Sequence, residues 1–202
     1  MRSYLNAALF TASLVTASQE SCKALVMSGG GSNGAWEVGV FWGFVNYANP
    51  DDFRYDVVTG VSAGSINTLG LAGWEVGQET EAAQWLSDLW NNLKTSDVWK
   101  NWTLSIAEGL TIKAGLLDNS PLLAFMEKVV ADNFTKYGRR VSLSAANVNT
   151  GEFHTFNQKT TPITDLAKVA FASASIPTVF PPFNWEGVGL FMDGGTIKNV
   201  DI

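Results

Sequence analysis

The stretch Gly60-Val61-Ser62-Ala63-Gly64 follows the apolar run Tyr55-Asp56-Val57-Val58-Thr59 and precedes small residues that favour the start of a helix. The apolar run predicts a buried strand, so the pentapeptide lies at a strand-to-helix turn. So tight a turn leaves no room for a Cβ on either side of the serine, and glycine fits there. The pattern G-x-S-x-G in this setting predicts a nucleophile elbow, which exposes the Ser62 hydroxyl at the top of a sheet. The alternative is an ordinary Gly/Ser turn, because the pentapeptide alone is common.

Strand-like and helix-like segments alternate outward from this turn, without an internal repeat or a linker. Strands are expected over residues 24–27, 55–59, 140–148, 152–157 and 189–192. Helices are expected over residues 35–47, 79–93, 120–130 and 161–171, and the first is apolar nearly all round and therefore predicted to be buried. Residues 97–118 are irregular and suit a lid or a lipid-facing flap. Strands separated by helices predict an α/β fold with a largely parallel sheet.

Composition and charge limit the kinds of function. The chain has 202 residues, of which 46% are hydrophobic and 16% charged, and this balance predicts one globular domain with a sizeable core. The net charge is −6 and Lys and Arg form no cluster, which disfavours a nucleic-acid partner. A single cysteine, Cys22, excludes an internal disulfide and a cysteine-based metal site, and a single histidine, His154, argues against zinc. No metal or cofactor is expected.

The first residues differ from the rest of the chain. Arg2 precedes an apolar stretch, and the small residues at positions 15–17 resemble a cleavage site. Residues 1–17 are therefore predicted to be a secretory signal peptide, which would place the protein outside the cell or in an endomembrane lumen. If residues 1–17 are only a tail, a cytoplasmic or peripheral-membrane protein is expected. The chemistry-bearing domain is expected to span residues 23–202.

Three glycine-rich turns each follow an expected strand: residues 28–34, the elbow, and Asp193-Gly194-Gly195. Because carboxyl ends of parallel strands share one sheet edge, these turns are expected to form one site. Consecutive glycines at Gly29, Gly30 and Gly31 let backbone amides converge on one point, as an oxyanion hole requires. The same loop also satisfies a dinucleotide fingerprint through Gly29, Gly31 and Gly34. Asp51 or Asp52 lies at a plausible distance for ribose in that case, and the loop alone leaves both functions open.

A serine nucleophile needs a neighbouring base, and Asp193 is the candidate. By itself, Asp193-Gly194 is more typical of an ordinary hairpin turn. Histidine is the usual partner of a serine, but His154 lies in a strand-like stretch and is interpreted as a surface or structural residue. A triad of Ser62, one of the aspartates and His154 remains the nearest enzymatic alternative.

Taken together, these blocks resemble the patatin-like phospholipases, a family of lipid acyl hydrolases. The resemblance runs from about Lys23 to the end of the chain. It is carried by the glycine loop, the elbow, the block Asp193-Gly194-Gly195, and residues 172–177 with Phe180-Pro181-Pro182. Four blocks in the right order indicate this family far more specifically than any one block does.

The resemblance implies a three-layer α/β/α sandwich with a largely parallel central sheet. It also implies ester hydrolysis on glycerolipids or phospholipids at a lipid or membrane surface. Ser62 would be the nucleophile, Asp193 the general base, and Gly29, Gly30 and Gly31 the oxyanion hole. The remaining motif glycines would shape the turns, and they are Gly34, Gly60, Gly64, Gly194 and Gly195. The oligomeric state is left open.

Two departures from the family pattern bear on activity. The family commonly has Arg or Lys where this chain has Asn33, so a phosphate or the oxyanion would be held less strongly. The chain also stops nine residues after Asp193, whereas the family usually continues with further strand and helix. The C-terminal part of the domain is therefore expected to be missing. A catalytically inactive lipid-binding protein is the alternative from another functional class.

Overall fold

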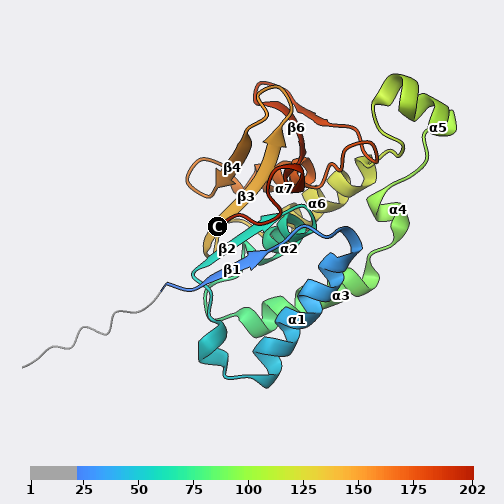
Figure 1. Ribbon diagram of the computed structural model, residues 1–202. Coiled ribbons are helices and arrows are strands. Elements are labelled where there is room, and N and C mark those ends of the chain that lie inside the picture. Colours follow the sequence, from blue (N-terminus) through green and yellow to red (C-terminus); the bar gives the residue numbers. More distant parts are fainter. Residues whose placement is uncertain (1–21) are drawn as a thin grey trace, which may run out of the picture.

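The computed structural model describes residues 22–202, so the predicted leader, residues 1–17, lies outside the described residues. A mixed sheet with helices packed against it organises this part of the chain (Figure 1). The strands are β1 Ala24–Met27, β2 Val57–Val61, β3 Arg140–Asn147, β4 Phe153–Asn157, β5 Phe183–Trp185 and β6 Gly189–Asp193. β1, β2 and β3 are mutually parallel, which confirms the predicted α/β fold with a largely parallel centre.

Helices connect the strands, and some of them pack directly against the sheet. They are α1 Gly34–Tyr47, α2 Ala63–Leu71, α3 Glu79–Asn92, α4 Thr95–Val98, α5 Ser105–Glu108, α6 Ser120–Asn133 and α7 Leu166–Ser173. Short helical turns complete the connections: η1 Gly31–Asn33, η2 Pro50–Phe53, η3 Gly109–Lys113, η4 Ile163–Asp165 and η5 Gly194–Thr196. None of the helices in residues 22–202 has both the length and the apolarity that crossing a membrane requires.

The pairing of β3 positions the strand ends. On one side, β2 runs parallel to Arg140–Ser144 and β6 runs antiparallel to Ala145–Asn147, while β4 occupies the other side. Since a strand has only two sides, β2 and β6 lie end to end along β3. Their carboxyl ends meet between Ser144 and Ala145. The sequence led us to expect a shared edge of parallel strands, whereas β6 is antiparallel and approaches from the opposite direction.

The two faces of the sheet differ in chemistry. Val58 of β2 and Leu143 of β3 belong to the hydrophobic core that the helices cover. Alternate residues point to the opposite face. There the Thr59 hydroxyl donates to the Asp201 carbonyl oxygen at 2.7 Å, and the Ser142 and Ser144 hydroxyls each donate to Asp201 Oδ2 at 2.8 Å. The C-terminal residues therefore lie across the hydroxyl-bearing face, and Figure 1 shows the C-terminus beside β2.

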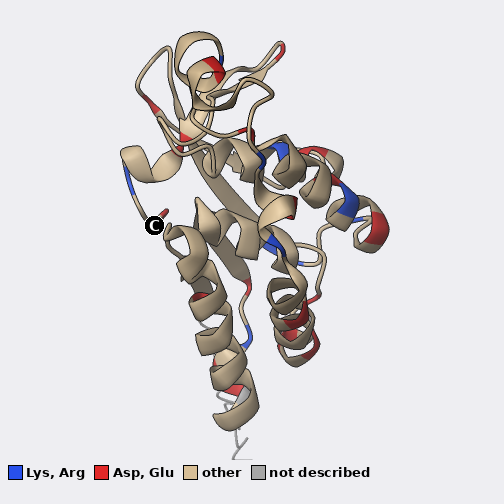
Figure 2. Cartoon of the chain, turned by 90° about the vertical axis from the view of Figure 1, so that its right-hand side faces the viewer, with Lys and Arg blue, Asp and Glu red and all other residues tan. Residues whose placement is uncertain are grey.

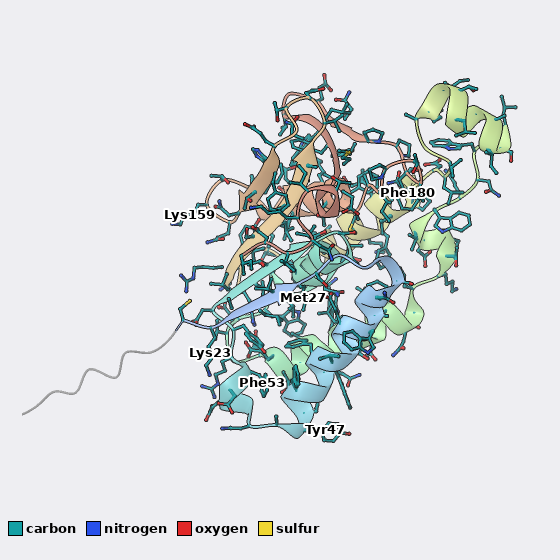
Figure 3. All side chains as sticks on the ribbon, viewed as in Figure 1. Lys23, Met27, Tyr47, Phe53, Lys159 and Phe180 are labelled. Atoms are coloured by element: carbon teal, nitrogen blue, oxygen red, sulfur yellow. The ribbon has the colours of Figure 1, made fainter. Side chains whose placement is uncertain are left out.

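Helix α1 differs from its prediction. We expected a buried helix, but only one stripe of it is buried, at Gly34, Val38, Phe41 and Val45. These positions recur every three or four residues, so they form one helical face. Trp36, Phe44 and Tyr47 are exposed, and Tyr47 lies at the end of α1 farthest from the glycine loop (Figure 3). An apolar composition all round did not bring burial all round.

Two other segments were not resolved by the sequence pattern. The second strand was expected over residues 55–59 and occupies Val57–Val61, so it reaches the elbow directly. Strand β5 was not expected, because its three residues are too few to show a period. It forms an antiparallel pair with β6. The irregular region 97–118 contains only the short helical segments α5 and η3 and the end of α4.

A buried ion pair holds the end of the sheet opposite the elbow. Arg139 Nη1 lies 2.9 Å from Glu79 Oε1, and their side chains are 0% and 6% exposed. The guanidinium also donates to the carbonyl oxygens of Trp74, Tyr55 and Glu75. This network joins the start of β3, the start of α3 and the residues before β2.

Replacing Arg139 with Met should lower the free energy of unfolding by about 3–5 kcal/mol, because the buried Glu79 side chain would lose its cationic partner. Urea unfolding measures the loss. Lys136→Met is the matched control, since Lys136 makes an exposed pair with Glu75 nearby, and its unfolding midpoint should barely move. Equal midpoints for the two variants would contradict this role of Arg139.

Candidate active site

Ser62 occupies a strained turn between β2 and α2. Its backbone has φ 53° and ψ −124°, in a region that non-glycine residues rarely adopt. The flanking glycines are required by contact: a Cβ on Gly60 would lie 2.2 Å from the Gly64 carbonyl oxygen, and one on Gly64 would lie 2.4 Å from the Met27 carbonyl oxygen. The turn therefore has the geometry of the nucleophile elbow that the sequence predicts.

Asp193 lies within hydrogen-bonding distance of this serine. Ser62 Oγ donates to Asp193 Oδ2 at 2.6 Å, although the residues are 131 positions apart. The second carboxylate oxygen accepts from the Gly195 amide at 2.7 Å. Both side chains are buried, and that burial raises the pKa of Asp193 although the bonds from Ser62 and Gly195 lower it. A buried carboxylate with a raised pKa beside a hydroxyl can accept the hydroxyl proton.

The glycine loop lies beside the serine. A Cβ on Gly29 would be 3.0 Å from the Ser62 Cβ, and one on Gly34 would be 3.1 Å from the Ala63 Cβ. The Gly29 amide donates to the Asn199 carbonyl oxygen at 3.1 Å, and the Asn199 side chain donates back to the Gly29 carbonyl oxygen at 3.0 Å. In the described part of the chain, the amides of Gly30 and Gly31 donate to no backbone acceptor.

An apolar cavity of about 440 Å³ opens beside Ser62. Most of its lining is hydrophobic, and it includes Gly31, Ser62, Ile66, Trp90, Leu93, Val98, Trp99, Leu122, Phe125, Ile176 and Phe180. Phe180 lies on the side of the molecule from which α5 projects (Figures 1 and 3). A cavity of this size and lining suits an apolar ligand segment that reaches the serine.

The histidine lies in a different setting. His154 on β4 and Asp193 on β6 pair with Ala145 from its two opposite sides. The imidazole packs against the ring of Phe156, with centroids 4.4 Å apart, and both oxygens of Asp193 are taken by other donors. His154 is exposed, and its interpretation as a surface or structural residue agrees with this placement.

The acidic residues of the dinucleotide alternative are not at the site. Asp51 and Asp52 lie in η2, before the amino end of β2, and Asp51 pairs with Arg54 at 3.0 Å. The glycine loop follows the carboxyl end of β1, which is parallel to β2, so these acids lie at the opposite end of the strands. Within residues 22–202, no group of three or more His, Cys, Asp or Glu side chains is placed to hold a metal ion.

Two residues of the site were not predicted from the sequence. Ser173, at the end of α7, accepts a hydrogen bond from the Ser62 amide at 2.8 Å. Asn199 clamps the glycine loop from the C-terminal segment. Ser173 lies in the block 172–177 that the family resemblance had marked, but nothing in its spacing shows that it faces the elbow. Asn199 follows Asp193 closely and carries no local pattern.

Charged side chains are interspersed rather than gathered. On the side seen in Figure 2, Lys and Arg alternate with Asp and Glu and form no basic patch. Lys94 lines the cavity itself, and Lys100, farther along the chain, pairs with Asp118 at 3.4 Å.

Known proteins are similar to this chain. Residues 25–202 match the model of the patatin-like phospholipase family. A cGAMP-activated phospholipase from Escherichia coli (strain TW11681) is 29% identical over 156 residues, which is 72% of this chain and 41% of that protein. VipD from Legionella pneumophila, known from a crystal structure, is 14% identical with a TM-score of 0.48, over 90% of this chain and 47% of VipD.

The chain thus spans less than half the length of either relative. The family model, in contrast, matches it from β1 to the last residue and includes every glycine-rich turn of the site. The chain belongs to the patatin-like phospholipase family.

Proposed function

We propose that the protein is a serine acyl hydrolase that cleaves fatty acyl esters of glycerolipids or phospholipids. The observation that carries the proposal is the 2.6 Å hydrogen bond from Ser62 Oγ to the buried Asp193 carboxylate, beside an apolar cavity. Membership of the family supports a hydrolase that acts on ester bonds. The two-residue mechanism and the lipid substrate are our proposals.

The first half of the reaction forms an acyl-enzyme. Asp193 Oδ2 takes the proton of Ser62 Oγ while the oxygen lone pair attacks the ester carbonyl carbon. The carbonyl π electrons move to oxygen and give a tetrahedral oxyanion. When the oxyanion collapses, the bond to the alcohol oxygen breaks, and the proton on Asp193 passes to that leaving oxygen.

The glycine loop supplies the stabilisation that this oxyanion needs. The amides of Gly30 and Gly31 donate to no backbone acceptor and lie at the start of α1, whose N-terminal end carries a partial positive charge. The Gly29 amide would first have to leave the Asn199 carbonyl oxygen. One such donor contributes on the order of 3 kcal/mol to transition-state stability.

The second half releases the fatty acid. Asp193 takes a proton from a water molecule, and the resulting hydroxide attacks the acyl carbon. Collapse of this second tetrahedral intermediate breaks the bond to Ser62 Oγ, and the proton returns to Ser62. The steps restore both side chains without a metal ion in the chemistry.

The cavity suits the acyl chain of such a substrate. Its lining is mostly aliphatic and aromatic, and Ser62 forms part of its wall, so an acyl chain inside would present its ester carbonyl to the hydroxyl. Asn33 brings no charge to the glycine loop. We therefore expect acyl chain contacts to contribute more to binding than a phosphate does.

A lipid surface is the partner that we propose for the projecting segment, residues 104–112. Its side chains Leu104, Ile106, Leu110 and Ile112 are 55–71% exposed. Trp99, which precedes the segment, lines the cavity, and Gly115, which follows it, packs against Phe180 and Pro181. An apolar projection continuous with the cavity mouth fits a lipid interface. Balanced charge at Lys100–Asp118 and Lys113–Glu108 favours a neutral phospholipid.

Ser62→Ala and Asp193→Asn should each abolish turnover of a p-nitrophenyl fatty ester, because the first removes the nucleophile and the second removes the base.

The pKa of Asp193 is raised in the folded state. The contribution of Asp193 to the stability of the fold is therefore present at low pH and is lost as the pH rises through the folded pKa. Asp193→Asn should therefore be at least as stable as the wild type at pH 7 in a thermal melt. Near-normal activity in Asp193→Asn would contradict the mechanism, and vesicle binding by an inactive wild type would support the lipid-binding alternative.

The acid limb of the activity profile should have its midpoint above the ordinary aspartate value of about 3.9. Burial raises the pKa of Asp193, and the residue must be ionised to accept a proton, so kcat/KM falls as the pH drops through that raised value. His154→Ala should leave the limb unchanged. A limb that disappears in His154→Ala would favour the histidine triad.

Leu110→Glu should weaken binding to phosphatidylcholine vesicles roughly tenfold or more, since it replaces an exposed apolar side chain with a charge. Turnover of a soluble short-chain ester should stay unchanged, because Leu110 does not line the cavity. Tyr47→Glu is the control, as Tyr47 is 83% exposed at the end of α1. Vesicle sedimentation measures both variants, and an equal loss in the two would refute the projection as the lipid contact.

A further inference from the structure

The backbone ladder is interrupted where β2 meets β6. Along β3, the pairing with β2 ends at Ser144 and the pairing with β6 begins at Ala145. The main-chain groups at this junction therefore lack the partners that a continuous strand would supply. The gap cannot be closed by moving the chains together, because a Cβ on Gly194 would already lie 2.5 Å from the Ser144 carbonyl oxygen. Buried backbone groups that lose their ladder partners need others.

One side chain bridges this gap. The Ser173 hydroxyl accepts from the Ser62 amide at 2.8 Å and donates to the Ser144 carbonyl oxygen at 2.6 Å. Ser173 is fully buried. A hydroxyl has a single proton, so donation to Ser144 directs a lone pair at the Ser62 amide. The Ser144 carbonyl oxygen of β3 thereby fixes the orientation of the Ser173 hydroxyl, and the hydroxyl in turn holds the Ser62 amide.

The Ser62 amide is the group through which the elbow conformation can be held. At φ 53° the backbone of Ser62 is in a strained region that persists only where surrounding contacts enforce it. Rotation about the N–Cα bond of Ser62 would move Oγ away from Asp193 Oδ2. The hydrogen bond from the Ser62 amide to Ser173 opposes that rotation, and Ser173 is not among the residues that line the cavity.

We propose that Ser173 is a positioning residue for the nucleophile, which holds the Ser62 amide so that Oγ remains in line with the Asp193 carboxylate. The proposal rests on the hydrolase function proposed above. It assigns to Ser173 no contact with substrate and no proton transfer. Its loss should slow the chemical step and leave the binding of the acyl chain intact.

Ser175 offers a matched control two residues away. It is also fully buried, but within residues 22–202 its hydroxyl donates only to the Phe171 carbonyl oxygen, at 2.9 Å, in α7. Its side chain contacts neither Ser62 nor Asp193 through a hydrogen bond. Ser175→Ala removes a buried hydroxyl of the same kind and keeps the main chain.

The test compares steady-state turnover of a p-nitrophenyl ester with the rate and the end point of fluorophosphonate labelling. Ser173→Ala should lower kcat and the labelling rate by roughly tenfold to a hundredfold, at unchanged KM and an unchanged labelled fraction. Ser175→Ala should keep both rates within about twofold. If Ser173→Ala is too unstable to assay, Ser173→Cys fills the space with a weak hydrogen-bonding group and should show the same split.

Two results would overturn the proposal. The first is equal turnover and labelling rates in the Ser173 and Ser175 variants. The second is a loss of activity in Ser173→Ala that appears only as a smaller labelled fraction, because partial unfolding produces that result. Ser62→Ala in the same assay separates this failure from that of the proposed function. Activity that survives in Ser62→Ala would remove the hydrolase mechanism itself, whatever Ser173 does.

Discussion

The end-to-end placement of β2 and β6 against one side of β3 is the constraint on which the site depends. It brings Ser62 and Asp193 into hydrogen-bonding contact across 131 residues of sequence. The space at this junction is so limited that Gly60, Gly64 and Gly194 cannot carry a side chain. These glycines therefore allow the ends of β2 and β6 to approach each other, and this approach places Ser62 beside Asp193.

Much of this arrangement could be predicted from the sequence. Gly60-Val61-Ser62-Ala63-Gly64 gives a strand-to-helix turn because the apolar run before it and the small residues after it are local patterns, and the structure has that turn. The strands expected over residues 140–148 and 152–157 also followed from local patterns, and the structure has β3 and β4 there. The family resemblance added Asp193, which by itself is only a turn aspartate, and the hydrogen bond from Ser62 agrees with that assignment.

The remainder depends on tertiary contacts that have no local pattern. The direction of β6 is set by its pairing with β5, a strand of three residues that no periodicity reveals. The exposure of Trp36 and Phe44 depends on which side of α1 meets the core, and an almost uniformly apolar helix does not specify that side. Ser173 and Asn199 each make two hydrogen bonds with backbone groups that are distant in the sequence, and no local sequence pattern reveals such bonds.

The most direct test of the account is to identify the residue that a fluorophosphonate probe modifies, by digestion of the labelled protein and mass spectrometry of the peptides. We expect one adduct, on Ser62, that is lost when Asp193 is replaced by Asn. An adduct on another serine, or full labelling of Ser62 without the Asp193 carboxylate, would contradict the claim that this one carboxylate activates this one hydroxyl.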